Sequence, residues 1–183
     1  MPSLATWAPE DGVLGAVAPL ALANAQPTAL VVDLDPRGPA YPSERSLRQL
    51  VDGGPRAADL TPQRRGLAVL ANGGVPWEAA RQLVDLLVEN WPAIVLRLPP
   101  RSEADVPAPR SPVRLLVPGG LFPPTGRGVF QRVSRYGLSH RPGPGAIVLP
   151  PAPRGQVAAL LAGRQPAPSR WLRAWGSVWE ATW

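Results

Sequence analysis

The segment Ala29-Leu30-Val31-Val32-Asp33-Leu34-Asp35-Pro36-Arg37-Gly38 decides the fold. Its four leading apolar residues predict a short buried strand, and the Pro and Gly that follow end that strand. Asp33 and Asp35 are two residues apart, so their side chains share one face of the strand end. In an open α/β sheet, ligands bind beside the carboxyl ends of the strands. We therefore expect the two carboxylates to face a crevice, where they suit a metal-bound nucleotide or an ordered water. Alternatively, Asp35 caps the turn before Pro36.

The composition indicates a single domain built from short elements. With 183 residues the chain is long enough for one ordinary hydrophobic core. Its 26 Pro and 18 Gly predict short helices and strands joined by many loops. The sequence contains no Cys, which excludes disulfides, thiolate metal sites and a cysteine nucleophile.

The charged residues are unusual because all 19 basic side chains are arginines, and the formal net charge is +6. The absence of lysine excludes a Walker-type phosphate-binding lysine and a Schiff-base lysine. A positive charge favours an acidic partner such as nucleic acid or an anionic membrane surface. The arginines are spread from Arg37 to Arg173, however, which is more typical of a solvated surface.

The N-terminal apolar stretch does not have the pattern of a secretory signal. Residues 13–25 are apolar, but Glu10 and Asp11 precede them where a signal carries positive charge, and Pro19 interrupts them. No run approaches the roughly 18 apolar residues that a membrane span needs. We expect a soluble, cytoplasmic protein.

Apolar runs and turn residues predict the order of elements over residues 1–165. Strands are expected at 3–7, 29–33, 66–71, 93–100, 113–117 and 146–149. Helices are expected at 16–24, 43–51, 76–90, 129–136 and 155–162. Ser43 is expected to cap the second of these helices. Alternation of strands and helices predicts an α/β domain, with a mostly parallel sheet of five to seven strands and helices on both faces.

The run Val31-Val32-Asp33-Leu34-Asp35-Pro36-Arg37-Gly38 resembles the signature DxDP-Q/R-G of the ParA/MinD class of P-loop ATPases. In that family the strand follows the helix of the phosphate-binding loop, and the expected elements fall in the order that the family requires. The resemblance covers most of residues 3–162. It implies the Rossmann-like topology of a P-loop NTPase.

Both motifs that carry nucleotide chemistry in that family are broken in this chain. Residues 8–15 align with the phosphate loop so that Gly15 takes the last glycine. Ala16 then replaces the catalytic lysine, and Val17 replaces the Mg-binding hydroxyl. The strand at 93–100 is similar to the Walker B strand VVVDLPP, but Arg97 stands where the family has its acid. The vestigial site implied by the resemblance comprises Gly12, Gly15, Asp33, Asp35 and Arg97.

These exchanges remove the chemistry expected of the site. Only backbone N–H groups remain to hold an anion at the helix N-terminus, and Glu10 and Asp11 add negative charge there. We therefore expect no ATP hydrolysis, no cofactor and no metal. Arg97 either faces solvent or pairs with Asp33 or Asp35 across neighbouring strand ends, in the place of the missing cation.

Tryptophans recur every four residues in the C-terminal segment, 166–183, at Trp171, Trp175, Trp179 and Trp183. This spacing predicts an amphipathic helix with one aromatic face. The helix could dock on its own sheet as core, or bind a protein partner or a second copy of the chain through these rings. As in MinD-like relatives, it could also lie on a membrane surface. Arg170 and Arg173 would contribute to binding of either a protein partner or an anionic membrane surface.

Two further features carry little chemistry. His140 is the only histidine and has no second ligand at metal-binding spacing, so it supports neither a metal site nor a catalytic triad. Arg127, Arg132 and Arg135 form the densest basic cluster, on the helix expected at 129–136.

The resemblance implies a non-catalytic pseudo-ATPase that acts as a protein-interaction or positioning module, without a small-molecule substrate. Degenerate relatives such as the CpaE/TadZ-like proteins are associated with placing pilus or secretion machinery and with septum-site control. A homodimer is compatible with this role. Two other hypotheses stay open: an ATPase that uses Asp33 and Asp35 with a backbone-only phosphate loop, and a nonspecific DNA-binding protein.

Overall fold

A computed structural model describes residues 2–100, 105–116, 128–133 and 142–181. The strands are β1 (Ser3–Trp7), β2 (Thr28–Asp33), β3 (Gly66–Leu70), β4 (Ile94–Arg97), β5 (Arg110–Leu116), β6 (Val129–Arg132) and β7 (Ile147–Leu149). The helices are α1 (Gly12–Asn24), α2 (Leu47–Gly53), α3 (Ala57–Leu60), α4 (Trp77–Asn90), α5 (Arg154–Leu161), α6 (Arg170–Ala174) and α7 (Gly176–Trp179).

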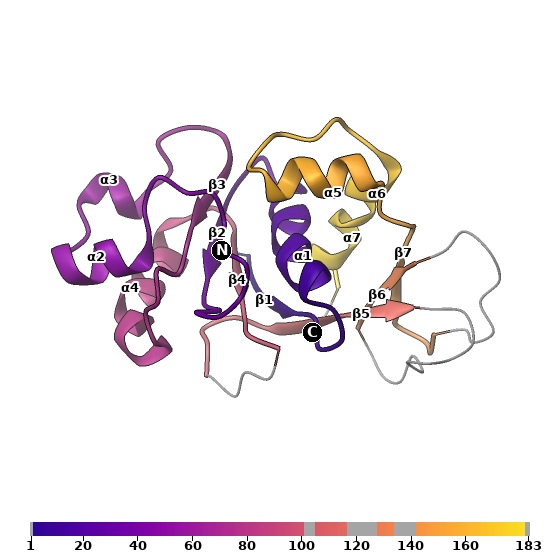
Figure 1. The fold of residues 1–183 in the computed structure, drawn as a ribbon, viewed down its shortest axis with the longest axis horizontal. Coiled ribbons are helices and arrows are strands. Elements are labelled where there is room, and N and C mark those ends of the chain that lie inside the picture. Colours follow the sequence, from indigo (N-terminus) through magenta and orange to yellow (C-terminus); the bar gives the residue numbers. More distant parts are fainter. Residues whose placement is uncertain (1, 101–104, 117–127, 134–141, 182–183) are drawn as a thin grey trace.

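The strands form one seven-stranded sheet in the order β3-β2-β4-β1-β5-β6-β7. Every neighbouring pair is parallel (Figure 1). Helices cover both faces, which makes the fold a Rossmann-like α/β sheet consistent with the topology of P-loop NTPases. The predicted fold class is confirmed. β2 and β4 lie side by side, so the strand that carries Asp33 and the strand that carries Arg97 end next to each other.

Two hydrophobic cores hold the layers together, one on each face of the sheet. The first lies between the sheet and the helices α1, α5, α6 and α7, and the second lies under α2 and α4. Residues 16–23 of α1 are all buried, because α1 is sandwiched between the sheet and the C-terminal helices. A helix that is apolar on every side requires such a position. α4 is amphipathic instead, with buried residues on one side only.

The predicted helix over 129–136 is wrong, because Val129–Arg132 forms β6. β6 lies between β5 and β7, and the side chains of Val129, Phe130 and Gln131 are buried there. Pairing on both sides overrides the weak local preference of a short apolar segment. Residues 134–136 lie outside the described residues, as do Arg127, Arg135 and His140.

Helix α2 begins later than expected, since its N-cap is Ser46 and not Ser43. The Ser46 hydroxyl accepts a hydrogen bond from the Gln49 backbone N–H at 3.3 Å, and the Gln49 side chain accepts one from the Ser46 N–H at 3.0 Å. This reciprocal pair is a capping box. The Ser43 hydroxyl instead donates to the carbonyl of Val69 in β3 at 2.6 Å. The short helix α3 was not predicted.

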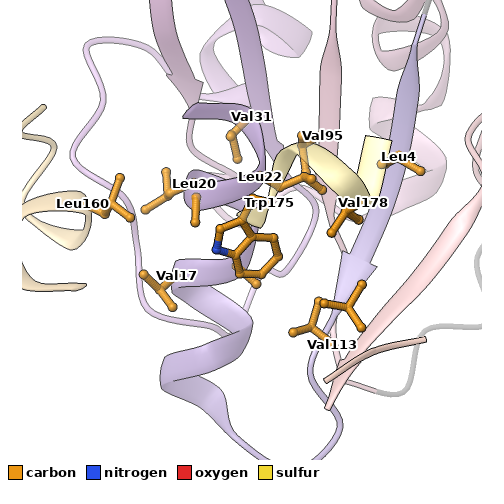
Figure 2. Close-up of a cluster of buried hydrophobic side chains, with 14 of the residues drawn as sticks. Leu4, Val17, Leu20, Leu22, Val31, Val95, Val113, Leu160, Trp175 and Val178 are labelled. Carbon is orange, nitrogen blue, oxygen red and sulfur yellow. The ribbon is translucent and has the colours of Figure 1, made fainter. Parts of the chain in front are cut away.

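The C-terminal segment is part of the first core. It forms two short helices, α6 and α7, where one helix was expected, and Gly176 begins the second. Glycine is a poor helix former, which favours a break there. Trp171 and Trp175 are 1% and 0% exposed, and their rings meet edge to face with centroids 6.0 Å apart. Trp175 lies among apolar side chains of α1, α5 and the sheet (Figure 2).

Of the three interpretations of the tryptophan stripe, docking on the chain's own sheet is confirmed for the described rings. The indole N–H of Trp171 donates to Gln131 Oε1 at 2.8 Å, and that of Trp179 donates to the carbonyl of Leu22 at 2.9 Å. The expectation that Trp171 and Trp175 anchor a partner is wrong for the folded chain, because both rings are enclosed. Arg170 and Arg173 are exposed, and Trp183 lies outside the described residues.

Of the helices in the described ranges, none combines the length and the apolar character that crossing a bilayer requires.

Candidate functional site

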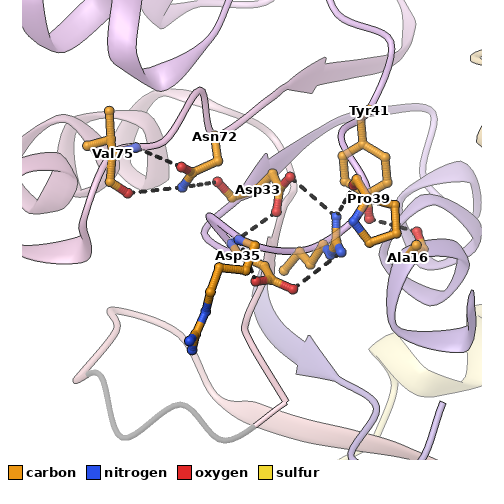
Figure 3. A network of polar contacts seen from close by, with 9 residues as sticks. Ala16, Asp33, Asp35, Pro39, Tyr41, Asn72 and Val75 are labelled. Atoms are coloured by element: carbon orange, nitrogen blue, oxygen red, sulfur yellow. Dashed lines mark hydrogen bonds and ion pairs between the residues drawn. The ribbon is translucent and has the colours of Figure 1, made fainter. Parts of the chain in front are cut away.

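Arg97 is buried at the carboxyl end of the sheet and bridges the carboxylates of Asp33 and Asp35. Figure 3 shows these two carboxylates within their network of polar contacts. Its Nη1 lies 3.3 Å from Asp33 Oδ2, and its Nη2 lies 3.4 Å from Asp35 Oδ2. Nη1 also donates to the carbonyl of Pro39 at 2.8 Å. Asp33 and Arg97 are register partners on β2 and β4, which brings the two side chains together. Of the two alternatives for Arg97, the structure shows the pairing with these acids and not a solvent-facing side chain.

Asp35 caps the turn after β2 and also pairs with Arg97. Its Oδ1 accepts a hydrogen bond from the Arg37 backbone N–H at 3.2 Å, so it does cap the turn after β2. Its other oxygen faces Arg97. Asp33 Oδ1 accepts from the Asp35 backbone N–H at 3.0 Å. In each carboxylate, one oxygen therefore accepts a hydrogen bond from the turn after β2, and the other oxygen pairs with the guanidinium of Arg97.

Two residues that the sequence analysis did not single out complete this network. Tyr41 lies against Arg97, with the guanidinium carbon 4.9 Å from the ring centroid, a cation–π distance. The Tyr41 hydroxyl donates to the carbonyl of Ala16 in α1 at 2.6 Å. Burial raises the pKa of Tyr41, so the hydroxyl stays protonated and remains a donor. The network thereby ties the turn after β2 to α1.

Asn72 holds the network from the side of β3. Its amide Nδ2 donates to the carbonyl of Asp33 at 3.1 Å and to that of Val75 at 3.2 Å. Its Oδ1 accepts from the Val75 backbone N–H at 2.8 Å. A buried amide with all these bonds fixes the ends of β2 and β3 relative to each other.

The expected phosphate loop is not formed. Helix α1 begins at Gly12, so the connection from β1 is only residues 8–11, and Gly12 and Gly15 lie in the first turn of the helix. Asp11 is the N-cap, and its Oδ1 accepts from the Leu14 N–H at 2.7 Å. A carboxylate thus already occupies the helix N-terminus where a phosphate would bind. Glu10 pairs with Arg114 at 2.6 Å.

The residues of the vestigial site nevertheless gather around one hollow. A cavity of about 380 Å³ is lined by Gly12, Gly15, Asp35, Arg37, Gly38 and Arg97, among others. Asp33 does not line it and lies beneath, 1% exposed. Among the described residues, no group of three His, Cys, Asp or Glu side chains is placed to hold a metal ion. The guanidinium of Arg97 would repel a cation at this position.

Gly38 allows the close approach of Arg97 and Asp35. A Cβ built at position 38 would overlap Arg97 Nη2 and Asp35 Oδ2. We expect Gly38→Ala to displace the ion pair and lower the free energy of unfolding by about 1–3 kcal/mol in urea titrations. Gly155→Ala is the matched control, since a Cβ at Gly155 meets nothing within 4 Å. The control should unfold at the same urea concentration as the wild type or slightly higher. Equal effects of the two substitutions would contradict the close approach.

Protonation of Asp33 follows from the charges in this network. One guanidinium faces two carboxylates, so the fully ionised site carries a net charge of −1. Burial is the largest influence and raises the pKa of Asp33 from 3.8 to about 6, although Arg97 acts in the opposite direction. Below about pH 6 the site then takes up one proton and becomes neutral.

This shift has a defined sign for stability. Between pH 4 and pH 6 the folded chain binds more protons than the unfolded chain, so the free energy of unfolding falls as pH rises through about 6. The free energy of unfolding changes by about 3 kcal/mol in total as pH rises from below 4 to above 6. About 1 kcal/mol of this loss occurs between pH 5 and pH 8. Urea titrations at both pH values should show this loss in the wild type and not in Asp33→Asn. Equal pH dependence in the two proteins would contradict the assignment to Asp33.

Comparison with models of protein families, with curated proteins and with solved structures gave no match. The function must therefore be argued from the geometry of the site itself.

Proposed function

We propose that the chain is a non-catalytic relative of the ParA/MinD class, a pseudo-ATPase that acts as a protein-interaction or positioning module. The single observation that carries this proposal is the buried guanidinium of Arg97 between Asp33 and Asp35. In a nucleotide-hydrolysing site of this class, carboxylates at these strand ends would face a hydrated magnesium ion. Here a covalently attached cation takes that position, so the acids are already paired.

The N-terminus of α1 supports the same conclusion. Phosphate binding at a helix N-terminus depends on free backbone N–H groups and the positive end of the helix dipole. The Asp11 carboxylate accepts a hydrogen bond from the Leu14 N–H at that end, whereas Glu10 is already paired with Arg114. A triphosphate would have to displace the cap and approach like charge. Binding of nucleotide is therefore unfavourable at the N-terminus of α1.

Calorimetric titration with Mg-ATP tests this proposal. We expect no saturable heat at millimolar nucleotide, for the wild type and for Gly155→Ala alike. Micromolar binding would overturn the proposal in favour of an ATPase with an atypical phosphate loop. Salt-sensitive retention of duplex DNA would favour the nonspecific DNA-binding alternative, since phosphate contacts are lost as salt rises.

A further inference from the structure

Strand β3 is the edge of the sheet (Figure 1). The Gly66 N–H donates to the carbonyl of Pro27 at 3.0 Å, on the β2 side. Successive residues of a strand direct their backbone groups to opposite sides, so those of Leu67 and Val69 point away from β2. The Ser43 hydroxyl donates to the Val69 carbonyl at 2.6 Å. No residue in the described ranges bonds the outward groups of Leu67.

A long groove runs along this edge. Its volume is about 740 Å³, and β3 residues 66–70 line it. Leu20 and Leu160 contribute from one face of the sheet, and Leu50 and Trp91 contribute from the other. Leu67, Ala68 and Val69 are each half-buried, so their apolar side chains are within reach of an occupant.

Arginines dominate the rim of the groove. Arg45, Arg64, Arg65 and Arg164 line it and are all exposed, against the two acids Glu44 and Asp59. Asp59 is already paired with Arg45, at 3.4 Å. Among the described residues, no acid lies within ion-pair distance of the other three arginines. The rim therefore carries unpaired positive charge beside the outward backbone groups of Leu67, which have no hydrogen-bond partner among the described residues.

We propose that this groove binds an extended acidic segment of a partner protein, which adds to β3 as an eighth strand. Main-chain hydrogen bonds to the N–H and carbonyl of Leu67 and to the N–H of Val69 would give the register, as in other cases of strand addition. The Val69 carbonyl keeps its bond to Ser43. Carboxylates of the segment would pair with Arg64, Arg65 and Arg164. The inference names the partner class for the proposed interaction role, on which it rests.

A second copy of the chain fits the groove less well. Edge-to-edge pairing of two β3 strands would bring two sets of these four arginines into one groove, with no excess of acids to neutralise them. Charged side chains on an edge strand oppose this kind of association. The formal net charge of +6 adds to the repulsion. An acidic partner removes the same repulsion, and the strand edge favours a peptide over a nucleic acid.

The test is fluorescence anisotropy with a labelled eight-residue peptide of alternating Val and Glu. The full chain should bind it, and binding should weaken as salt rises. A peptide of the same charge with Pro at alternate valines cannot pair as a strand, and it should bind at least about tenfold more weakly. The Val/Lys peptide should not bind.

Two charge-reversal variants locate the site. Arg64→Glu/Arg65→Glu should weaken binding of the Val/Glu peptide at least about tenfold. Arg170→Glu/Arg173→Glu makes the same charge change at exposed positions that do not line the groove, and it should have little effect. The inference is overturned if the Val/Glu peptide does not bind or if the Pro peptide binds equally well. Equal weakening of peptide binding in the two variants also overturns the inference. So does a wild-type dimer that the Arg64→Glu/Arg65→Glu substitutions dissociate, because the groove would then bind a second copy of the chain. The Mg-ATP titration repeated on Arg64→Glu/Arg65→Glu reports the Arg97 site without these two groove arginines, so the two proposals fail separately.

Discussion

Replacing Arg97 with Met is expected to lower the free energy of unfolding by about 3–5 kcal/mol at pH 8. The substitution leaves Asp33 and Asp35 facing each other with side chains only 2% and 9% exposed. Asp33, which lies beneath the hollow, cannot recover its hydration without opening the turn after β2. Met has a similar length, so the loss reports the missing charge more than missing volume. Urea denaturation followed by circular dichroism gives the measurement.

An exposed ion pair provides the control for Arg97→Met. Arg81 lies 4.0 Å from Asp105, with side chains 57% and 94% exposed. Arg81→Met should change the free energy of unfolding by less than about 1 kcal/mol, because water screens such pairs. A second check is the triple variant Asp33→Asn/Asp35→Asn/Arg97→Met, which removes all three buried charges together. It should recover a large part of the stability that Arg97→Met loses.

A loss below about 1 kcal/mol in Arg97→Met would contradict the role given to this residue. It would mean that the carboxylates reach solvent or another cation when the guanidinium is removed. The proposed function would then lose its principal support, since the acids could accept a metal ion as readily as they accept Arg97.

The Arg97 site could be predicted in part because it depends on short-range geometry. Two acids spaced two apart at a strand end share a face, and Arg97 follows an apolar run of the same kind. Adjacency of β2 and β4 supplies the remaining condition. Tyr41 and Asn72 were missed because their contacts join loops that are far apart in sequence. Two sequence signals could have pointed to them: a Tyr in a Pro-rich loop, and an Asn directly before Gly73.

The start of α1 was misplaced for a different reason. The resemblance to a phosphate loop extended the connection to Gly15, whereas the local signal favoured an earlier start. Asp11 stands three residues before Leu14, the spacing at which a side chain caps a helix N-terminus. Local capping chemistry was the better guide, because the residues that would have required a long loop are absent.

The error at β6 shows the limit of local patterns. Four residues of mixed character do not distinguish a strand from a helical turn. What fixes Val129–Arg132 as a strand is pairing with β5 and β7 on its two sides, together with the bond from Trp171 to Gln131. All three contacts come from distant parts of the chain.

Trp175→Ala is expected to lower the free energy of unfolding by about 3–5 kcal/mol, or to prevent folding. Trp175 is 0% exposed and lies beside Val17, Leu20 and Leu22 of α1 (Figure 2). Leu86→Ala on the outer side of α4 is the control. Leu86 is 42% exposed, so its loss should be well below that of Trp175→Ala. If the Trp175→Ala chain folds with unchanged stability, Trp175 does not stabilise the core, and the interpretation that it binds a partner would be favoured again.

A matched pair of milder substitutions separates volume from hydrogen bonding in the same core. Trp171→Phe removes the donor to Gln131 Oε1 and leaves that buried oxygen without its 2.8 Å partner. Trp175 Nε1 has no partner among the described residues, so Trp175→Phe removes a buried donor that was already unsatisfied. Both changes delete the same atoms from rings of nearly equal burial. Trp171→Phe should therefore cost about 1–2 kcal/mol more than Trp175→Phe. Equal losses would mean that shape alone, and not the bond to β6, holds the C-terminal segment on the sheet.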